Sequence, residues 1–207
     1  MLLTIHPDNP DTRKLKLVTE CLQDGGVIIY PTDTVYGLGC DFSNTSAIER
    51  LCRIKGIKSN KANFAFICSD LSHISEYAKP FGTNIYKLMR RCLPGAFTFI
   101  LNATSRVPKL LNNNRKTIGI RVPDHNIALQ IVSSLGNPII STSLKLNDDI
   151  NEYPTDAEFI HDQFHKLVDI VIDGGVGLSE PSTVIDCTDN TPVLIRQGAG
   201  ILPFALS

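Results

Sequence analysis

The sequence lacks long apolar runs and an excess of charge of either sign. No stretch of about eighteen apolar residues occurs, so we expect no membrane-spanning helix. Lys and Arg total 20 against 21 Asp and Glu, a formal net charge of -1. Such a chain has no global attraction for nucleic acid, and any basic surface has to be local. Residues 1–7 lack the charged start and apolar stretch of a signal peptide, so a cytoplasmic protein is expected.

The chain also lacks the short motifs of several chemistries. It has no Cys-x-x-Cys pair, no Gly-x-x-x-x-Gly-Lys-Ser/Thr phosphate loop and no Gly-x-Gly-x-x-Gly fingerprint. No Gly-x-Ser-x-Gly elbow surrounds Ser141 or Ser143, which argues against a serine hydrolase. The six cysteines are scattered and mostly lie in apolar segments, so we expect reduced core thiols rather than disulfides or zinc ligands. No residue is expected to bind a metal directly.

Apolar runs and segments with helical spacing alternate along most of the 207 residues. Strands are expected over residues 2–5, 27–30, 64–68, 97–101, 117–122, 139–142, 168–172, 183–186 and 193–196. Helices are expected from a cap at Asp11 or Thr12 to a stop at residues 24–26, and over residues 46–54, 83–92, 126–135 and 157–167. Residues 102–116 are expected to form a mobile loop, and residues 146–155 are irregular. The alternation predicts one α/β domain over residues 1–207, with a mixed sheet because several connections look too short for crossovers.

One stretch joins an apolar strand to a polar loop. Val27–Tyr30 has no helical period and predicts a buried strand, which Pro31 ends because proline lacks a backbone N–H. The loop that follows offers four ligand-capable side chains, those of Thr32, Asp33, Thr34 and Tyr36. Loops at strand ends are common ligand positions, but hydroxyl groups also cap ordinary turns. From these residues alone, both interpretations stay open.

Residues 30–38, Tyr-Pro-Thr-Asp-Thr-Val-Tyr-Gly-Leu, resemble the opening signature of the YrdC/TsaC family. The resemblance continues through residues 93–101, which contain Pro-Gly-x-x-Thr, and residues 119–125, which contain Arg-x-Pro-x-His. Residues 141–143, 181–186 and 195–199 complete the same order. Because these ordered segments span most of the chain, it is identified as a member of this family, and the branch it most resembles is YciO.

The family resemblance implies a fold and a reaction. The fold is a twisted open sheet with flanking helices and a concave ligand face. The reaction is the formation of threonylcarbamoyl-AMP and pyrophosphate from L-threonine, bicarbonate and ATP, for the threonylcarbamoyladenosine modification of tRNA. Positioning two anions and neutralising phosphate charge can drive this chemistry without a protein nucleophile. Mg²⁺ is expected to accompany ATP, held largely by phosphates.

The resemblance also implies roles for individual side chains. The residues expected to hold L-threonine are Thr34, Arg121, Ser141 and Ser182. The residues expected to contact ATP are Lys55, Lys58, Thr117, Ser143 and Arg196, and Lys55 and Lys61 are expected to neutralise phosphate charge during catalysis. From residue chemistry alone, the lysines could equally be a solvated helix end that complements the helix dipole. Arg121, in contrast, ends a predicted strand, where a buried arginine needs an anionic partner.

Two positions depart from the family pattern. Its usual Lys-x-Arg is Lys55-Gly56-Ile57 here, so the guanidinium that would hold phosphate bidentately is missing. Its usual Ser-x-Asn is Ser143-Leu144-Lys145, so a neutral amide has become a cation. Weak activity or a related but different acceptor is compatible with these changes.

Other interpretations remain at this point. The rival function is a non-catalytic or weakly catalytic protein that binds tRNA or double-stranded RNA through phosphates, on a concave face supplemented by surrounding cations. Those cations are Lys87, Arg90, Arg91, Arg106, Lys109, Arg115 and Lys116. A carbamoyl-phosphate-type or other nucleotidyl enzyme is a third possibility. His125 either caps the helix that follows it or lines the site as a donor.

Overall fold

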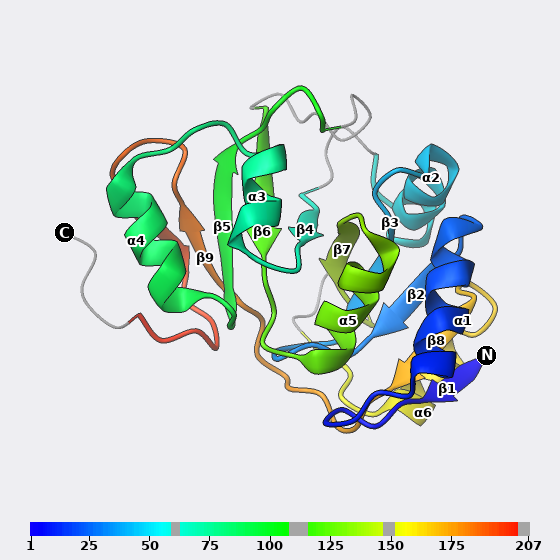
Figure 1. Cartoon of the computed structure of the whole chain (residues 1–207). Helices are drawn as coiled ribbons and strands as arrows, with labels where there is room; N and C mark the ends of the chain where they lie inside the picture. Colours follow the sequence, from blue (N-terminus) through cyan, green and yellow to red (C-terminus); the bar gives the residue numbers. More distant parts are fainter. Residues whose placement is uncertain (59–62, 108–115, 147–151, 203–207) are drawn as a thin grey trace.

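In a computed structural model of the chain, which describes residues 1–58, 63–107, 116–146 and 152–202, the strands form one ten-stranded sheet in the order β1-β8-β2-β3-β7-β4-β6-β5-β9-β10 (Figure 1). The strands are β1 (Leu2–Thr4), β2 (Val27–Tyr30), β3 (Gly37–Asp41), β4 (Ala65–Ile67), β5 (Phe97–Asn102), β6 (Thr117–Arg121), β7 (Ile139–Ser143), β8 (Ile170–Asp173), β9 (Thr183–Asp186) and β10 (Val193–Arg196). The helices are α1 (Thr12–Gln23), α2 (Thr45–Ile54), α3 (Leu71–Tyr77), α4 (Thr83–Cys92), α5 (Asn126–Leu135) and α6 (Ala157–Phe164).

The sheet is open and mixed. Strand β8 is parallel to β1 and β2, β4 is parallel to β6, and β5 is parallel to β9, while the remaining neighbours are antiparallel. The strand direction changes across the sheet, from the upright β5 and β6 to the slanted β2 (Figure 1). The predicted α/β class, with a twisted open mixed sheet and flanking helices, is confirmed.

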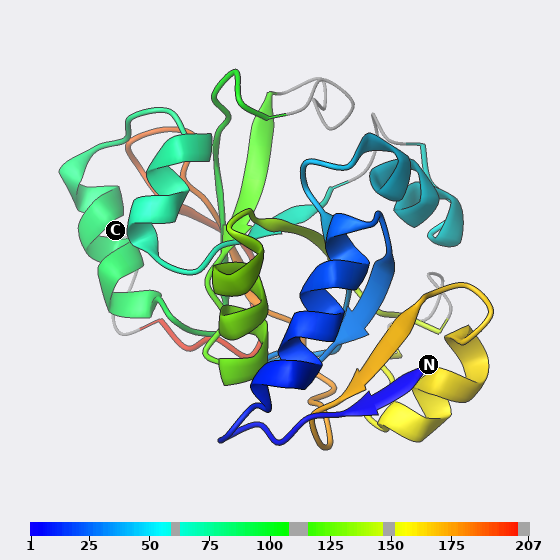
Figure 2. The same cartoon turned by 45° about the vertical axis from the view of Figure 1, so that its right-hand side comes forward.

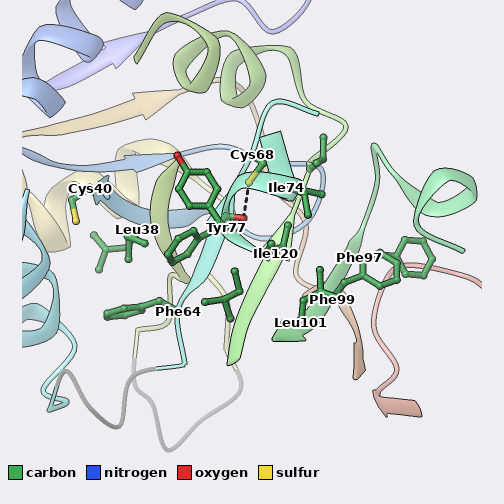
Figure 3. Packing of buried hydrophobic residues seen from close by; sticks show 14 of the residues in the cluster. Leu38, Cys40, Phe64, Cys68, Ile74, Tyr77, Phe97, Phe99, Leu101 and Ile120 are labelled. Carbon is green, nitrogen blue, oxygen red and sulfur yellow. Dashed lines mark hydrogen bonds between the residues drawn. The ribbon is translucent and has the colours of Figure 1, made fainter. Parts of the chain in front are cut away.

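The two faces of the sheet are covered differently. On the first face, apolar residues such as Phe66, Phe99 and Ile120 pack with α2, α3, α4 and α6 in one core cluster. Figure 3 shows Ile120 of this cluster close to Ile74 of α3, and Phe99 beside Phe97 and Leu101.

On the second face, Ile28, Tyr30, Ile67 and Ile139 pack against α1 and α5, which lie side by side (Figure 2). The second face continues over β5, β6 and β9, where Thr98, Ile100, Thr117 and Val184 are only half-buried. This part, together with the adjoining Ser143 end of β7 and Arg196 end of β10, is named here the half-exposed face, and it contains several of the side chains that the sequence singled out.

Strand β3 was not predicted, because its sequence Gly-Leu-Gly-Cys-Asp contains two glycines, which usually weaken a strand. The ring of Tyr30 explains them, since it lies over this strand. A Cβ at Gly37 would lie 2.9 Å from Tyr30 Cζ, and a Cβ at Gly39 would lie 2.7 Å from Ile139 Cγ2. Any larger side chain would push the tyrosine or the neighbouring strand away.

Other element boundaries also differ from prediction. The seven-residue α3 was not expected, and α6 ends at Phe164 rather than at residue 167. The predicted mobile loop begins later than residue 102, because Asn102 belongs to β5 and Ala103 forms a bridge with Ala78. Residues 108–115 of that loop lie outside the described residues.

The cysteines lie mainly inside the protein. All six are free, and five of them are buried. Within the described residues, no helix is both long and apolar enough to cross a membrane.

Candidate functional site

Arg121 forms the centre of a buried polar cluster at the end of β6. Its side chain is 8% exposed and forms an ion pair with Asp33, whose side chain is 11% exposed. Arg121 Nη2 also donates to Thr34 Oγ1 at 2.7 Å and to Thr32 Oγ1 at 3.3 Å. Strand β6 therefore presents its arginine to the loop that follows β2, and the anionic partner expected for Arg121 is Asp33.

The loop after β2 holds its hydroxyl groups in a fixed arrangement. Thr32 Oγ1 donates to Val35 O at 2.8 Å and accepts from Thr34 N at 3.1 Å. Because the hydroxyl hydrogen of Thr32 is used on Val35 O, Thr34 donates in the 3.2 Å contact between the two hydroxyls. Three acceptors thus share the two hydrogens of Arg121 Nη2, and the rest of the guanidinium is left for other partners.

Three buried polar atoms in this region have no hydrogen-bond partner among the described residues. They are Asp33 Oδ2, Arg121 Nε and His125 Nδ1. Leaving a buried donor or acceptor unpaired costs about 1–3 kcal/mol, so such atoms in a folded protein usually face a ligand or a water molecule. Their presence in one small region indicates a binding site.

His125 occupies the N-cap position of α5, but its side chain makes no capping hydrogen bond. The expectation that it caps this helix is therefore wrong. Burial lowers the pKa of the imidazole below its ordinary value of 6.5. Asp33 and Asp124 act in the opposite direction, and Arg121 lowers this pKa further. The ring is therefore neutral near pH 7, and its Nδ1 can either donate or accept.

Thr98, Ser182 and Arg196 lie beside Arg121 on the half-exposed face. The register of β5 and β6 places Thr98 next to Arg121, and Arg196 lies in the same row on β10. The hydroxyls of Thr98 and Ser182 are 2.8 Å apart, and Arg196 Nη2 donates to Ser182 O at 2.7 Å. The structure thus brings Ser182 to the same end of the face as Arg121. It also places Arg196, expected to contact ATP, at this end.

The segment after β10 is fastened to the start of β9. Thr183 Oγ1 donates to Gly200 O at 2.7 Å and accepts from Gly198 N at 2.9 Å. Gln197 Nε2 donates to the carbonyls of Gly198 and Gly200 at 2.7 and 2.8 Å. A Cβ at Gly198 would lie 2.2 Å from Pro181 O, so glycine alone permits this approach. These contacts fix the edge of the site formed by β9 and β10.

The connection from β8 to β9 also packs against the loop that holds Thr34. Leu178 N donates to Thr34 O at 3.1 Å, and Tyr36 Oη donates to Gly175 O at 2.7 Å. A Cβ at Gly177 would lie 2.7 Å from the Tyr36 ring, so the connection can run this close only with glycine there. These contacts bring the segment leading to Ser182 next to the loop after β2.

Thr117 and Ser143 mark the other end of the half-exposed face. Strand β4 pairs with both β6 and β7, and extending those registers places Thr117 and Ser143 on either side of its entry. Both residues are half-buried. Thr117 precedes Arg121 by four residues, a distance of about 13 Å along a strand. Two expected ATP contacts are therefore near each other and separate from the Arg121 cluster.

The lysines expected to bind phosphate precede β4. Lys55 is the C-cap of α2 and is half-buried, and Lys58 is exposed on the connection that leads toward β4. Lys61 lies outside the described residues. Residues 63–64, the described part of the chain just before β4, meet the sheet at the Thr117 end of the face.

The two departures from the family pattern have defined surroundings. Ile57 is half-buried and packs against the first-face core. Lys145 Nζ lies 5.6 Å from the centroid of the Tyr153 ring, a cation–π distance. Whether Lys145 compensates for Ile57 stays a question for experiment.

Ser141, expected to hold threonine, lies inside the protein with 5% exposure. Its Oγ accepts from Tyr30 Oη at 2.7 Å and lies 3.4 Å from Leu38 O as a donor. Burial raises the pKa of Tyr30 to about 12, so its hydroxyl remains a donor. Ser141 therefore supports the buried tyrosine, and its role toward threonine stays a prediction.

The basic residues expected to supplement an RNA-binding face lie mostly elsewhere. Three of them are exposed on α4, namely Lys87, Arg90 and Arg91. Helix α4 packs against the first face, so the expectation that they extend the face bearing Arg121 is wrong. Arg106 pairs with Glu76, and Lys116 is exposed just before β6. Lys109 and Arg115 lie outside the described residues.

The sequence alone indicated no role for Thr98, and it did not indicate that Asp33 is the partner of Arg121. Thr98 was detectable as the hydroxyl residue within the otherwise apolar strand of residues 97–101. The pairing of Asp33 with Arg121 joins positions 88 residues apart and could not be deduced from one sequence. In the described parts of the chain, no group of three or more His, Cys, Asp or Glu residues could hold a metal ion.

Comparisons with known proteins place these observations in a family. The Sua5/YciO/YrdC family model, described as telomere recombination, matches residues 20–198. The uncharacterised protein YciO of Escherichia coli K12 is 46% identical over 204 residues, which cover 97% of each chain. The crystal structure of E. coli YciO superposes with a TM-score of 0.91 at 43% identity and covers 98% of both chains.

Two further relatives have informative names. A threonylcarbamoyl-AMP synthase of Vibrio vulnificus is 34% identical over 187 residues, covering 89% of this chain and 98% of that protein. The crystal structure of Pyrococcus abyssi Sua5 complexed with L-threonine has a TM-score of 0.87 at 27% identity, covering 96% of this chain and 57% of that one.

Proposed function

The chain belongs to the Sua5/YciO/YrdC family, and on this premise we propose that it forms threonylcarbamoyl-AMP and pyrophosphate from L-threonine, bicarbonate and ATP. The product would serve the threonylcarbamoyladenosine modification of tRNA. The relative named threonylcarbamoyl-AMP synthase and the Sua5 solved with L-threonine support the choice of reaction and amino acid.

The observation on which this proposal rests most is the buried Arg121 with its unpartnered Nε. Its Nη2 is held by Asp33 and Thr34, so the guanidinium cannot turn freely. The Nε–H that stays unpartnered can donate one charge-assisted hydrogen bond to an oxygen of a carboxylate. We therefore assign the threonine carboxylate to Arg121, with the hydroxyls of Thr34 and Ser182 nearby.

The nucleotide would occupy the opposite end of the half-exposed face. Thr117 and Ser143 lie there, and β4, the strand that follows Lys55 and Lys58 in the sequence, begins at the same end. The separation of about 13 Å between Thr117 and Arg121 leaves room for a threonine and a phosphate chain between the two ends. Arg196 lies at the Arg121 end, where it would contact phosphates that extend toward threonine, and Lys61 would neutralise phosphate charge together with Lys55.

The reaction requires the protein mainly to position two anions. The ammonium group of threonine first loses a proton to solvent, and the free amine takes up the carbon of bicarbonate with loss of water. A carboxylate oxygen of the resulting carbamate then attacks the α-phosphorus of ATP. The P–O bond to the β-phosphate breaks, and pyrophosphate leaves. Cations that neutralise the phosphate oxygens can supply most of the acceleration. Mg²⁺ would enter as the ATP complex and contribute phosphate neutralisation.

The test is incorporation of labelled bicarbonate into an adenylate by the purified protein with ATP, Mg²⁺ and each of several amino acids. The matched variants are Arg121→Ala and Arg90→Ala, since Arg90 lies exposed on α4, over the other face of the sheet. We expect threonine-dependent product that is lost in Arg121→Ala and retained in Arg90→Ala. Absence of product with every amino acid, despite measurable ATP or RNA binding, would withdraw the synthase assignment in favour of a binding function.

A further inference from the structure

The donors and acceptors left unpaired in the site differ in kind. Arg121 Nε is a charged donor, Asp33 Oδ2 is a charged acceptor, and His125 Nδ1 belongs to a ring that can either donate or accept. Asp33 and Arg121 are already joined through Oδ1 and Nη2, so their unused atoms lie in one cluster. His125 follows Arg121 by four residues, and the charges of Asp33 and Arg121 both act on the pKa of its imidazole.

Within the described residues, none of these three atoms has a hydrogen-bond partner. The side chain of His125 makes no capping hydrogen bond to α5, and the ion pair between Asp33 and Arg121 uses the other carboxylate oxygen, Oδ1. Keeping several buried groups unpaired is costly in a protein of marginal stability. A ligand with matching groups would remove that cost on binding, which favours recognition by complementary polar groups.

A β-hydroxy-α-amino acid has a carboxylate, an ammonium group and a hydroxyl, which match these atoms one for one. We propose that Asp33 Oδ2 binds the ammonium group and His125 Nδ1 binds the side-chain hydroxyl of the amino acid. These two residues thereby determine specificity, while Arg121 takes the carboxylate. This inference rests on the proposed function and deepens it, because it names the groups that distinguish threonine from its isosteres.

Two analogues of threonine separate the two contacts. L-Valine has nearly the shape of threonine but a methyl group in place of the hydroxyl. (2S,3R)-2,3-Dihydroxybutanoate keeps the carboxylate and side chain but has a hydroxyl in place of the ammonium group. Binding of all three to the full chain would be measured by calorimetry at pH 8 without ATP, so the readout does not depend on turnover.

Each variant is expected to remove one preference and keep the other. The unmodified protein should bind threonine at least about tenfold more tightly than either analogue, because a site with a buried polar group rejects ligands that leave it unpaired. His125→Leu should bring threonine and valine within about threefold of each other while the preference over the dihydroxy acid remains. Asp33→Asn should instead remove the preference for threonine over the dihydroxy acid and keep the preference for threonine over valine. His125→Asn, which keeps a hydrogen-bonding group near the position of Nδ1, should retain much of the preference for threonine over valine.

Several outcomes overturn the inference without affecting the proposed function. Threonine and valine binding equally well to the unmodified protein would exclude a hydroxyl contact, and a tightly bound dihydroxy acid would exclude an ammonium contact. These comparisons need no variant, so they hold even if Asp33→Asn fails to fold. If His125→Leu keeps the preference for threonine over valine, His125 does not recognise the side-chain hydroxyl. Failure of all three compounds to bind would instead defeat both this inference and the amino-acid substrate of the proposed function.

Discussion

The two ends of the half-exposed face differ in how deeply their side chains are buried, since Arg121 and Ser182 are buried whereas Thr117 and Ser143 are half-buried. The Arg121 end contains a buried ion pair, paired hydroxyls and the contacts around Thr183, beside the three polar atoms that stay unpaired. At the Thr117 end, the predicted contacts are half-buried hydroxyls and lysines of a connecting segment. Both departures from the family pattern, Ile57 and Lys145, concern residues predicted for this second end.

The difference suggests a division of labour between the two ends. A small zwitterion must be distinguished from similar molecules, which requires fixed donors and acceptors. A triphosphate carries several charges and can be held by flexible cations that need no single geometry. We therefore expect changes at the Arg121 end to affect stability and specificity together, and changes at the Thr117 end to affect mainly the rate.

The largest effect is expected when Arg121 is replaced by Met, a side chain of similar length without charge. The substitution leaves the Asp33 carboxylate buried without its partner, which costs about 3–5 kcal/mol of unfolding free energy. Chemical denaturation would measure the loss. Arg196→Met is the matched control, because Arg196 lies in the same row but is exposed, and should cost less than about 1 kcal/mol.

The double variant Arg121→Met/Asp33→Asn separates this explanation from a loss of packing. Removing the carboxylate charge should restore part of the stability lost in Arg121→Met. If the double variant is less stable than the single one, the burial of an unpaired charge is not the cause of the loss.

A second test restores the family pattern at the Thr117 end. Ile57→Arg with Lys145→Asn supplies a guanidinium for phosphate and removes the extra cation, and we expect adenylate formation to rise about 10- to 100-fold. The rate of labelled product formation would be measured beside Ile57→Gln/Lys145→Asn, which changes the same positions without adding the guanidinium. Unchanged or lower turnover would mean that these positions do not limit activity, and the assumed weakness of this end would be wrong.

Replacement of Ser141 is expected to have a smaller effect. The residue can act either by supporting Tyr30 or by contacting threonine, and the test separates these two roles. Replacing it with Ala leaves Tyr30 Oη without its partner inside the protein, and we expect a loss of about 1–3 kcal/mol in unfolding free energy. Threonine affinity should change less than twofold if the residue acts only through the tyrosine. A large loss of affinity with little loss of stability would instead support the predicted contact with threonine.

The agreement between expected and observed elements indicates which parts of the molecule a single sequence can predict. Strand β2 and helices α4 and α5 have the expected boundaries, because periodic apolar residues and clear stop signals determine them locally. Strand β3 escaped prediction because its glycines make room for a tyrosine of another strand, a relation that exists only after folding.

The same distinction applies to the site. The need of Arg121 for an anion followed from its chemistry and position, and its pairing with Asp33 supplies that anion. The identity of the partner depended on a loop that reaches across the sheet from β2. The unpaired Nδ1 of His125 likewise depends on which neighbours surround the ring, so the sequence left both of its interpretations open.

The smallest expected effect is the contribution of His125 to the pH dependence of stability, which tests the burial of the Arg121 end directly. Burial holds the pKa of His125 below 6.5 in the folded protein, whereas the unfolded chain takes up this proton near pH 6.5. The unfolded state therefore binds more protons between the two pKa values. The stability linked to His125 is complete above pH 6.5 and falls as the pH drops toward the folded value. Comparing the unfolding free energy of the unmodified protein with that of His125→Asn between pH 5 and 8 should show a gap that shifts against the unmodified protein on acidification. A shift in the opposite direction would mean that the charges of Asp33 and Asp124 outweigh burial, and that the imidazole is protonated, and so only a donor, when substrate binds.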